Sequence, residues 1–420
     1  MAQRATDVAS RHDACRQEDR EHDVVIVGGG LVGASLAIAL DRIGIDVGLV
    51  EAAPAGALPA VFDERNLSFA QASVNALSAL GVLQKLRAST GQIRRIHVSR
   101  NGDFGRVKLE ATDYGRESFG QVVVARDFGA ALEARLDELT HLTRYRPARF
   151  VGLEDANGDR RDVRIVAADG ERVLSTRLLV AADGTRSGVR DALGIAAQEH
   201  DYAQTLFVAR LRAERAPDGT AYERFGDDGP TALLPRGDRH YGVVHGVARE
   251  EADVVAALDD AAFLARIQSA FGWRVGRLLS VGARSAYPAT RVRAARITTA
   301  RAVLVGNAAQ TLHPAGAQGF NLGLRDALTL AELIETRAGD PGADGLLGEY
   351  NQRRNDDRTR TIAFSDGLAK LTADRATLLR PLRSAGLLAL DRMPSAQAWL
   401  VGGAMGYRGD VPKLCRAGAA

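Results

Sequence analysis

The sequence is poor in cysteine, with two residues, Cys15 and Cys415, placed near opposite ends of a chain of 420. Two cysteines cannot build a disulfide framework, so we expect a reducing compartment. The eight histidines are scattered, without a second ligand at metal-binding spacing, and aromatic residues make up only 5% of the chain. These shortages exclude a disulfide-stapled domain and lead us to expect no metal site.

Long hydrophobic runs are also missing. No stretch approaches the roughly 18 apolar residues that a transmembrane helix needs. The first 22 residues mix Arg with Asp and Glu and have no apolar centre, which argues against a secretory signal or an organelle transit peptide. We interpret residues 1–22 as a disordered leader and expect a cytoplasmic protein.

Neither sign of charge is in large excess, because 55 Lys and Arg residues are interspersed with 52 Asp and Glu residues, for a net charge of +3. This balance gives little support for nucleic-acid binding. Hydrophobic residues make up 46% of the chain, which is ordinary for a globular protein. The length predicts about two or three domains.

The strongest motif lies where order begins, at Asp23. The letters DVVIVGGG predict a buried strand, LVGASLAIALDRIG a helix and IDVGLVE a second strand, which together form a βαβ unit. Gly28, Gly30 and Gly33 give the spacing G-x-G-x-x-G, and Glu51 ends the second strand. The glycines allow a tight turn, backbone approach to a pyrophosphate and close helix packing, while the acid accepts from ribose hydroxyls. The motif therefore predicts a binding site for a dinucleotide, either FAD or NAD.

Two further glycine-containing turns help to decide between FAD and NAD. Asp183 and Gly184 follow the strand-like letters RLLVAA, and a second turn lies within LVGNAAQTLHPAGAQGFNLGLRDALTLAELI, residues 304–334. A simple NAD dehydrogenase needs a catalytic histidine or a Ser-Tyr-Lys set, and no such set fits here. Widely separated loops in addition to the first turn favour a cofactor that extends beyond one mononucleotide.

With these motifs the chain resembles a known family, the ubiquinone-biosynthesis hydroxylases among the class A FAD-dependent monooxygenases. The resemblance covers most of the chain, through VVIVGGGLVGASLAIAL, DERNLSFAQASVNALSALGV, ERFGDDGPTALLPR, the Asp183-Gly184 motif and LVGNAAQTLHPAGAQGFNLGLRDALTLAE. Asn307 stands where most relatives carry Asp. This form is most similar to the 2-polyprenyl-6-methoxyphenol hydroxylase branch, as is YNQRRNDDRTRTIAFSDGLAKL near the C-terminus.

The resemblance implies an α/β fold, with a Rossmann-type FAD-binding domain interleaved with a β-sheet-rich substrate domain like that of aromatic hydroxylases, followed by C-terminal helices. We expect the FAD-binding domain to comprise 23–90, 116–195 and 296–335, and the substrate domain 91–115 and 196–295. The C-terminal helical region would be 336–420. The alternating pattern around Asn101-Gly102 predicts a β-hairpin at the start of the inserted β-rich segment.

The resemblance also implies which residues hold FAD. They are Gly28, Gly30, Gly33 and Glu51 for the ADP half, Arg65 and Arg126 along the pyrophosphate and ribityl, Asp183 and Gly184 for FAD and the reductant, Asn307 at the ribityl, and Pro314, Gly316, Gly319, Phe320 and Asn321 beside the isoalloxazine. A helix starting near Phe320 would point its amides, and Asn321 its donors, at the flavin, favouring the anionic reduced form.

The implied mechanism needs no protein nucleophile. NAD(P)H docks transiently and reduces FAD, O2 adds to give a flavin C4a-hydroperoxide, and this delivers oxygen to the ring of a polyprenylated phenol, while the protein positions the substrate and excludes water. We therefore assign no catalytic residue. His313 has two interpretations, an active-site donor or a turn-stabilising side chain, and we favour the second.

Other assignments also have alternatives. Arg65 either contacts FAD or satisfies a loop, and Asn307 either weakens FAD binding or keeps its hydrogen bonds while removing a charge. The Arg- and Leu-containing C-terminal stretch suits either an interfacial, membrane-associated helix on the cytoplasmic face or packing within the protein. Besides the leading function, a hydroxylase of soluble aromatics and a flavin-binding subunit of a ubiquinone-synthesis complex remain open.

Overall fold

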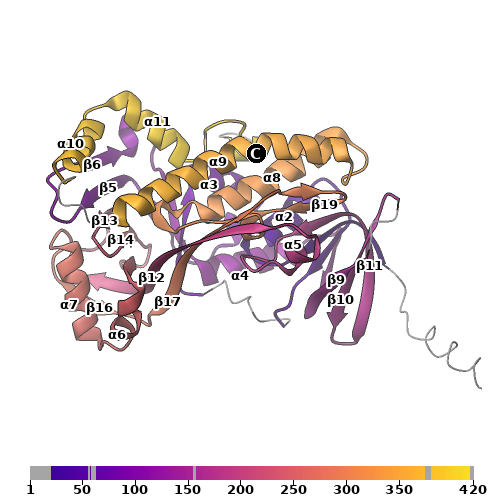
Figure 1. Cartoon of the computed structure of the whole chain (residues 1–420), viewed down its shortest axis with the longest axis horizontal. Coiled ribbons are helices and arrows are strands. Elements are labelled where there is room, and N and C mark those ends of the chain that lie inside the picture. The colour runs from indigo at the N-terminus through magenta and orange to yellow at the C-terminus, as the bar shows by residue number, and fades with distance from the viewer. Residues whose placement is uncertain (1–19, 55–56, 58–62, 155–157, 374–379, 417–420) are drawn as a thin grey trace, which may run out of the picture.

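The computed structural model describes residues 20–54, 57, 63–154, 158–373 and 380–416. Two large sheets lie at opposite ends of an elongated molecule, and helices run along one side of it (Figure 1). The predicted leader of 1–22 lies mostly outside the described residues. The prediction of disorder is wrong for residues 20–22, because the first strand begins at Arg20, where backbone pairing with Leu174 extends the strand.

The first sheet has eight strands and forms the Rossmann-type half, with a path of β18-β19-β11-β1-β2-β8. Strands β19, β11, β1, β2 and β8 run parallel, and β9, β10 and β18 add antiparallel pairs. The strands are β1 (Arg20–Val27), β2 (Val47–Val50), β8 (Leu142–Tyr145), β9 (Ala148–Leu153), β10 (Arg161–Ala167), β11 (Gly170–Ala181), β18 (Thr298–Thr299) and β19 (Ala302–Leu304).

Helices pack against this sheet, and the central strands are buried on both faces, as a parallel sheet requires. The burial explains the run of β-branched residues in β1, whose Val24, Val25 and Ile26 have no exposed surface. The helices are α2 (Leu31–Asp41), α3 (Gln71–Ala79), α4 (Ala125–Leu136), α5 (Gly188–Ala192), α8 (Gly319–Arg337) and α9 (Asp344–Ala373).

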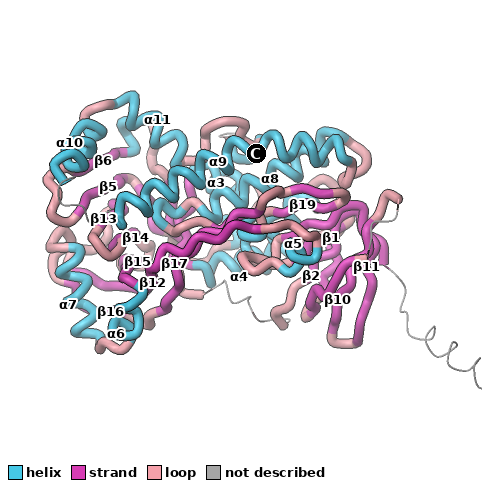
Figure 2. Tube along the Cα trace, viewed as in Figure 1, coloured by secondary structure: helices cyan, strands magenta, loops and turns pink. Residues whose placement is uncertain are grey.

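The second sheet has nine strands, in the order β20-β17-β12-β15-β14-β13-β5-β6, with β16 paired to β12. Long strands β12 and β17 run side by side from this sheet toward the Rossmann half (Figure 2). The strands are β5 (Arg95–Arg100), β6 (Arg106–Glu110), β12 (Ala197–Ala213), β13 (Thr220–Phe225), β14 (Pro230–Pro235), β15 (Tyr241–Ala248), β16 (Leu278–Val281), β17 (Ser285–Ala294) and β20 (Gln310–Thr311).

The predicted hairpin is confirmed, since β5 and β6 pair across a turn that contains Asn101 and Gly102. One face of the second sheet packs on helices α6 (Ala252–Ala256) and α7 (Asp260–Phe271), through a hydrophobic cluster that includes Phe207 and Val243. The inserted segments therefore build their own core, separate from the core of the Rossmann half.

The remaining elements are a small sheet and two C-terminal helices. A small sheet pairs β3 with β7 and β7 with β4, and helices α10 and α11 lie beside β5 and β6 at one end of the molecule (Figure 1). Their bounds are β3 (Asn66–Ala70), β4 (Gly91–Ile93), β7 (Gly120–Val124), α10 (Arg380–Asp391) and α11 (Pro394–Ala404).

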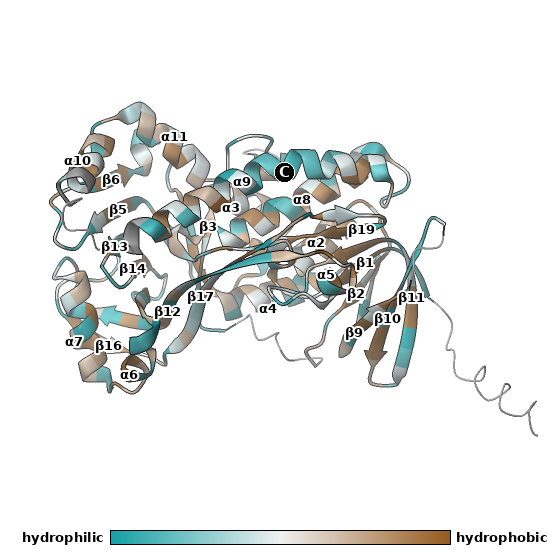
Figure 3. Ribbon diagram, in the orientation of Figure 1, coloured by the Kyte–Doolittle hydropathy of each residue, from teal (hydrophilic) through white to brown (hydrophobic). Residues whose placement is uncertain are grey.

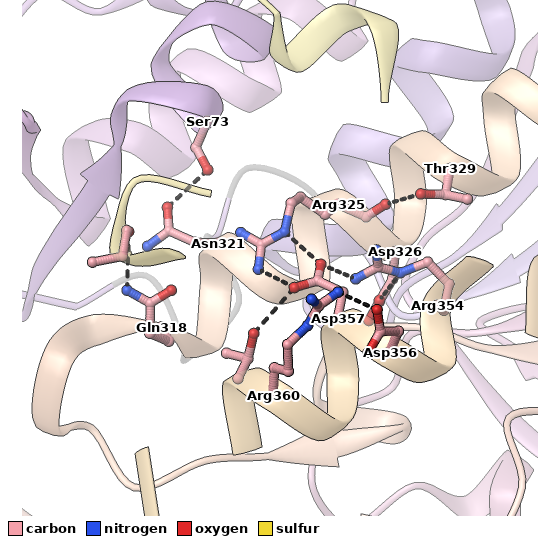
Figure 4. Close-up of polar contacts among 12 residues, drawn as sticks. Ser73, Gln318, Asn321, Arg325, Asp326, Thr329, Arg354, Asp356, Asp357 and Arg360 are labelled. Carbon is pink, nitrogen blue, oxygen red and sulfur yellow. Dashed lines mark hydrogen bonds and ion pairs between the residues drawn. The ribbon is translucent and has the colours of Figure 1, made fainter. Parts of the chain in front are cut away.

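A buried ion network joins helices α8 and α9 (Figure 4). Arg354 Nε donates to Asp326 Oδ1 at 2.8 Å, and Arg354 Nη2 donates to Asp357 Oδ2 at 2.8 Å. Asp357 in turn accepts two hydrogen bonds from Arg325, at 2.7 and 3.1 Å. Much of α9 is hydrophilic in Figure 3, yet the Arg354 side chain is 0% exposed. The polar face of α9 can be buried because each charged side chain in this network contacts one of opposite charge.

The charges in this network depend on one another. Burial alone would lower the pKa of Arg354, but the Asp326 and Asp357 carboxylates raise it above its usual range. Burial alone would raise the pKa of Asp357, but Arg325 and Arg354 lower it well below the usual range. Loss of one member of such a group leaves its partners buried and uncompensated.

The first prediction concerns Arg354→Met, which keeps side-chain length and removes the cation. Because Asp326 and Asp357 would lose a buried partner, we expect the free energy of unfolding to fall by about 3–5 kcal/mol. Urea unfolding of the purified protein measures it. The matched control is Arg360→Met, whose ion pair with Asp356 is exposed on the same helix and should contribute at most about 1 kcal/mol. Equal unfolding midpoints for the two variants would contradict this account.

Candidate FAD site

The first glycine-rich turn connects β1 to α2. Gly28 has a φ of +107°, and a Cβ added there would lie 2.4 Å from the carbonyl oxygen of Ala182. A Cβ at Gly33 would lie 1.9 Å from the carbonyl oxygen of Gly28. Both positions therefore require glycine. Gly30 is the N-cap of α2 and makes no side-chain cap bond, so the first-turn amides of this helix are free to face an anion.

Glu51 lies directly beside this turn. Its Oε2 accepts from the backbone N–H of Gly29 at 2.8 Å, and its Oε1 accepts from that of Ala53 at 2.7 Å. These two bonds fix the carboxylate at the end of β2. A carboxylate has about four acceptor positions, so it keeps capacity for ribose hydroxyls.

The Asp183 loop follows β11 and lies against the first turn, because the Gly28 position abuts the backbone of Ala182 and Asp183. Asp183 accepts from Ser187 Oγ at 2.5 Å and from the Val189 N–H at 3.1 Å. Burial raises the pKa of Asp183. Its carboxylate therefore holds the start of α5, and the adjacent Gly184, with a φ of +88°, leaves the loop backbone uncovered.

The third turn, which contains Asn307, meets the other two. A Cβ at Gly306 would lie 3.0 Å from Val32 Cγ2, on the first turn of α2. Arg190 donates to the carbonyl oxygens of Thr185 and Ala308, at 3.1 and 3.2 Å. Segments that lie far apart in the sequence, around Gly28, Asp183 and Asn307, thus converge at one edge of the first sheet.

Asn307 itself has an exposed side chain, and no partner for its side-chain amide occurs within the described part of the chain. The turn is held from behind by Asp326, whose Oδ2 accepts from the Gly306 N–H at 3.3 Å and from Gln310 Nε2 at 2.6 Å. Arg358 Nε donates to Gln310 Oε1 at 2.6 Å. The α8–α9 ion network therefore fixes the conformation in which the Asn307 amide is presented.

Sequence reasoning did not find the residues that support this turn. Asp326, Arg354 and Arg358 are essential to its geometry, but they lie on helices that the sequence identified only as helical or as part of a resemblance. A signal was present in the letters RRNDDR, which place opposite charges at helical i, i+3 spacing in a segment that must pack.

His313 is buried in the loop that follows. Its Nδ1 accepts from the Ala315 N–H at 3.1 Å, so Nε2 carries the proton and donates to Gln204 Oε1 at 3.2 Å. Burial lowers the pKa of His313 to about 4, which keeps the ring neutral at pH 7. These contacts support the turn-stabilising interpretation of His313.

The segment from Pro314 to Asn321 forms a short 3-10 turn, Ala315–Ala317, and then begins α8 at Gly319. Gly316 has a φ of +73°, and no described atom lies within 4 Å of a Cβ built at Gly319. The Phe320 ring packs at 5.2 Å from Phe69. The backbone of this segment is thus open at Gly319, and Pro314 is exposed, whereas Gln318 and Asn321 are buried.

Asn321 has a different role from the one we expected for its side chain. Its Oδ1 accepts from the Ala70 N–H at 2.8 Å. The same atom accepts from Ser73 Oγ at 2.7 Å (Figure 4). Its Nδ2 donates to the carbonyl oxygens of Ser68 and Ala317, at 2.9 and 2.8 Å. These bonds join α8 to β3, to α3 and to the Ala315–Ala317 turn, and they use the whole hydrogen-bonding capacity of the side chain. Only the backbone N–H of Asn321 remains as a donor to a cofactor.

Arg65 and Arg126 lie together near the start of α4, since the Arg126 N–H donates to the Asp63 carbonyl oxygen at 2.9 Å. Arg65 binds both carboxylate oxygens of Asp63 at 2.8 Å and stacks 4.3 Å from the ring centroid of Tyr287. Arg126 is exposed and pairs with Glu64. Arg65 therefore stabilises its own loop through Asp63. A contact between FAD and either arginine stays a prediction.

These features fit FAD. The glycine turn supplies backbone that a Cβ would obstruct, Glu51 supplies fixed acceptors, and the Asn307 amide supplies a donor and an acceptor where the three segments meet. Within the described residues, no group of His, Cys, Asp and Glu is arranged to hold a metal ion. When bound, FAD supplies redox chemistry that amino-acid side chains lack, and this chain supplies its binding and orientation.

Comparison with known proteins agrees with this geometry. A family model described as an FAD binding domain matches residues 21–365. The chain belongs to the FAD-dependent monooxygenase family. It is therefore a flavoenzyme whose cofactor is FAD, and the predicted resemblance to this family is confirmed.

Similar proteins include the ubiquinone hydroxylase UbiL of Rhodospirillum rubrum, which is 34% identical over 95% of this chain and 93% of that protein. The 3-demethoxyubiquinol 3-hydroxylase of Escherichia coli is 29% identical over 88% of this chain and 95% of that protein. Among solved structures, the p-nitrophenol 4-monooxygenase PnpA of Pseudomonas putida has a TM-score of 0.76 at 17% identity, covering 93% of this chain and 100% of that chain. The last comparison confirms the predicted fold.

The second prediction concerns Asn307→Asp, which changes the charge of an exposed side chain and keeps its shape. A carboxylate at this place would disfavour the anionic reduced flavin, so we expect the midpoint potential of bound FAD to become more negative. Potentiometric titration of the purified flavoprotein measures it, and FAD retention on a desalting column is recorded in parallel. Unchanged potential and retention would remove any electrostatic role for Asn307.

Proposed function

We propose that this chain hydroxylates the aromatic ring of a polyprenylated phenol in ubiquinone biosynthesis, with FAD as cofactor and with NAD(P)H and O2 as cosubstrates. The observation that carries the proposal is the 34% identity to a ubiquinone hydroxylase over 95% of this chain and 93% of that protein. The likeness to a p-nitrophenol monooxygenase, at 17% identity, concerns the fold alone and gives no support to a soluble aromatic substrate.

The chemistry of the site is compatible with this activity. The Asn307 turn and the start of α8 offer backbone and amide groups, and the one histidine of the loop, His313, is buried and neutral. A monooxygenase of this family needs no protein nucleophile, since the cofactor carries the reactive oxygen. The narrower assignment to the 2-polyprenyl-6-methoxyphenol branch, and with it the ring carbon, stays a prediction.

The third prediction tests this activity with purified, FAD-loaded protein and 2-geranyl-6-methoxyphenol as a short-chain substrate. We expect this phenol to stimulate NAD(P)H oxidation and to gain one oxygen atom from isotopically labelled O2, detected by mass spectrometry. 4-Hydroxybenzoate should do neither. Turnover of 4-hydroxybenzoate instead would favour a soluble aromatic substrate, and an absence of O2 uptake with any phenol would favour the assembly-subunit alternative.

We further propose that the C-terminal helices contact the lipid surface in which polyprenylated phenols dissolve. One side of α11 packs inward, because Val401 and Met405 belong to a hydrophobic cluster with Ile93. Large apolar side chains elsewhere on these helices, in the connection between them and on the adjacent β5–β6 turn are exposed: Phe104 by 71%, Leu388 by 38%, Met393 by 51% and Trp399 by 65%. Among the described residues, no helix combines the length and apolar composition needed to cross a bilayer.

The fourth prediction concerns the double variant Met393→Ser with Trp399→Ser. Exposed aromatic and apolar residues anchor a protein at the interface of a bilayer, so we expect this variant to float with liposomes of phosphatidylglycerol and phosphatidylethanolamine less than the unmodified protein does. The control is Trp273→Ser, which removes a tryptophan of similar exposure, 67%, after α7. Equal flotation of all three proteins would contradict lipid contact by α11.

A further inference from the structure

The nine-stranded sheet has a face that does not pack on α6 and α7. The strand register places Glu223 of β13 between Val98 of β5 and Ala232 of β14, and Ala232 lies opposite Val244 of β15. Val244 lies opposite Val208 of β12. These paired residues form a row on one face of the sheet, since side chains directly opposite each other in a sheet share a face. Glu223 is the only ionisable side chain in this row.

This face is turned toward the FAD-binding half. The neighbour of Glu223 in β13, Tyr222, packs on Phe271 of α7 with ring centroids 5.5 Å apart, so Glu223 must point the other way. On the Glu223 side, Asn66 of β3, the strand that Asn321 joins to α8, approaches so closely that a Cβ at Gly242 would lie 2.0 Å from its Nδ2. The row therefore lies between the second sheet and the cofactor-binding half.

Part of this row is not covered by packing. Glu223, Val208 and Val244 are partly exposed, although they lie on inner strands of the sheet. Ala232 is buried between them, and Val98 packs against a buried cluster. At either side the same face is covered. Ala221 belongs to a buried cluster with Val401 and Met405, while Asn66 lies against Gly242. An accessible, mostly apolar strip with one carboxyl group thus remains between covered regions.

The carboxyl of Glu223 has no hydrogen bond or ion pair with any described residue. Burial raises its pKa to about 7. The nearest cation on this face by register, Arg100, is opposite Phe225 and is bound to Asp227 at 2.6 Å. Because Glu223 is partly exposed, its carboxyl remains within reach of a ligand. A carboxyl with a shifted pKa and no partner in the protein is a candidate for a functional site, where a ligand supplies the missing partner.

We propose that Glu223 binds the phenolic O–H of the substrate and accepts its proton while the ring is hydroxylated. This inference rests on the proposed function. The phenolic O–H bond breaks, its electron pair stays on the phenolic oxygen, and the proton forms an O–H bond with the carboxylate. The added electron density activates the ring carbons ortho and para to that oxygen. When the hydroxylated carbon loses its own proton to water, Glu223 returns its proton to the phenolic oxygen.

The test compares the FAD-loaded unmodified enzyme with Glu223→Gln and with Glu110→Gln, an exposed glutamate of the same sheet. General-base assistance contributes about 10²–10⁴-fold, so Glu223→Gln should lower the hydroxylation rate of 2-geranyl-6-methoxyphenol at least ~100-fold in single turnover. Reduction of FAD by NAD(P)H without substrate should be unchanged. Glu110→Gln should match the unmodified enzyme in both measurements.

A second arm separates base chemistry from a structural effect. The phenol ionises without help as the pH rises toward its own pKa of about 10, and it then needs no base. The ratio of unmodified to Glu223→Gln hydroxylation rates should therefore fall toward one as the pH is raised from 7 to 9.5. If the ratio stays equally large across this pH range, or if Glu223→Gln hydroxylates the phenol at full rate at pH 7, Glu223 is not the base.

A third measurement does not depend on turnover. The absorbance band of bound phenolate should appear when 2-geranyl-6-methoxyphenol binds the oxidised unmodified enzyme, and Glu223→Gln should bind the phenol without this band. Identical spectra for the two proteins would overturn the inference about Glu223. Unmodified enzyme that ionises the phenol but never hydroxylates it would overturn the proposed function and leave the role of Glu223 supported.

Discussion

The contact between Arg354 and Asp326 is the interaction on which the cofactor site depends. It is buried, and it joins α9 to α8 at 2.8 Å. The other oxygen of Asp326 holds Gly306 and Gln310, so an ion pair between two helices sets the backbone of the turn that presents Asn307. Because a buried carboxylate with no cation is costly, this turn cannot easily change shape while the helices remain packed.

This arrangement explains why the site can be made mainly of backbone. The turns around Gly28, Asp183 and Asn307 carry few side chains that could react, and each is fixed from behind: the first by helix packing at Gly33, the second by Ser187 and the third by Asp326. A flavoenzyme leaves the difficult chemistry to its cofactor, and precise placement of polar backbone groups is what the protein contributes. The carboxyl of Glu223 belongs to the separate task of handling the substrate.

The parts predictable from sequence are those that local chemistry determines. The βαβ unit, the need for glycine at Gly28 and Gly33, and the β5–β6 hairpin follow from residue type and short spacing. The support of the Asn307 turn does not, because Asp326 and Arg354 are brought together only when two helices pack. Asn321 shows the same limit: its position beside the helix start was correct, but its partners Ala70 and Ser73 come from a distant segment. Glu223 required knowledge of strand register, which no single segment contains.

A crystal structure of the complex with FAD would test the central claim most directly. We expect the ribityl hydroxyls to lie within hydrogen-bond distance of the Asn307 amide, with the hydrogen bonds from Gly306 and Gln310 to Asp326, and from Arg354 to Asp326, all retained. A complex in which the 306–310 turn is rebuilt and Asp326 has released it, or in which FAD does not reach Asn307, would contradict a site fixed in advance by the α8–α9 ion network.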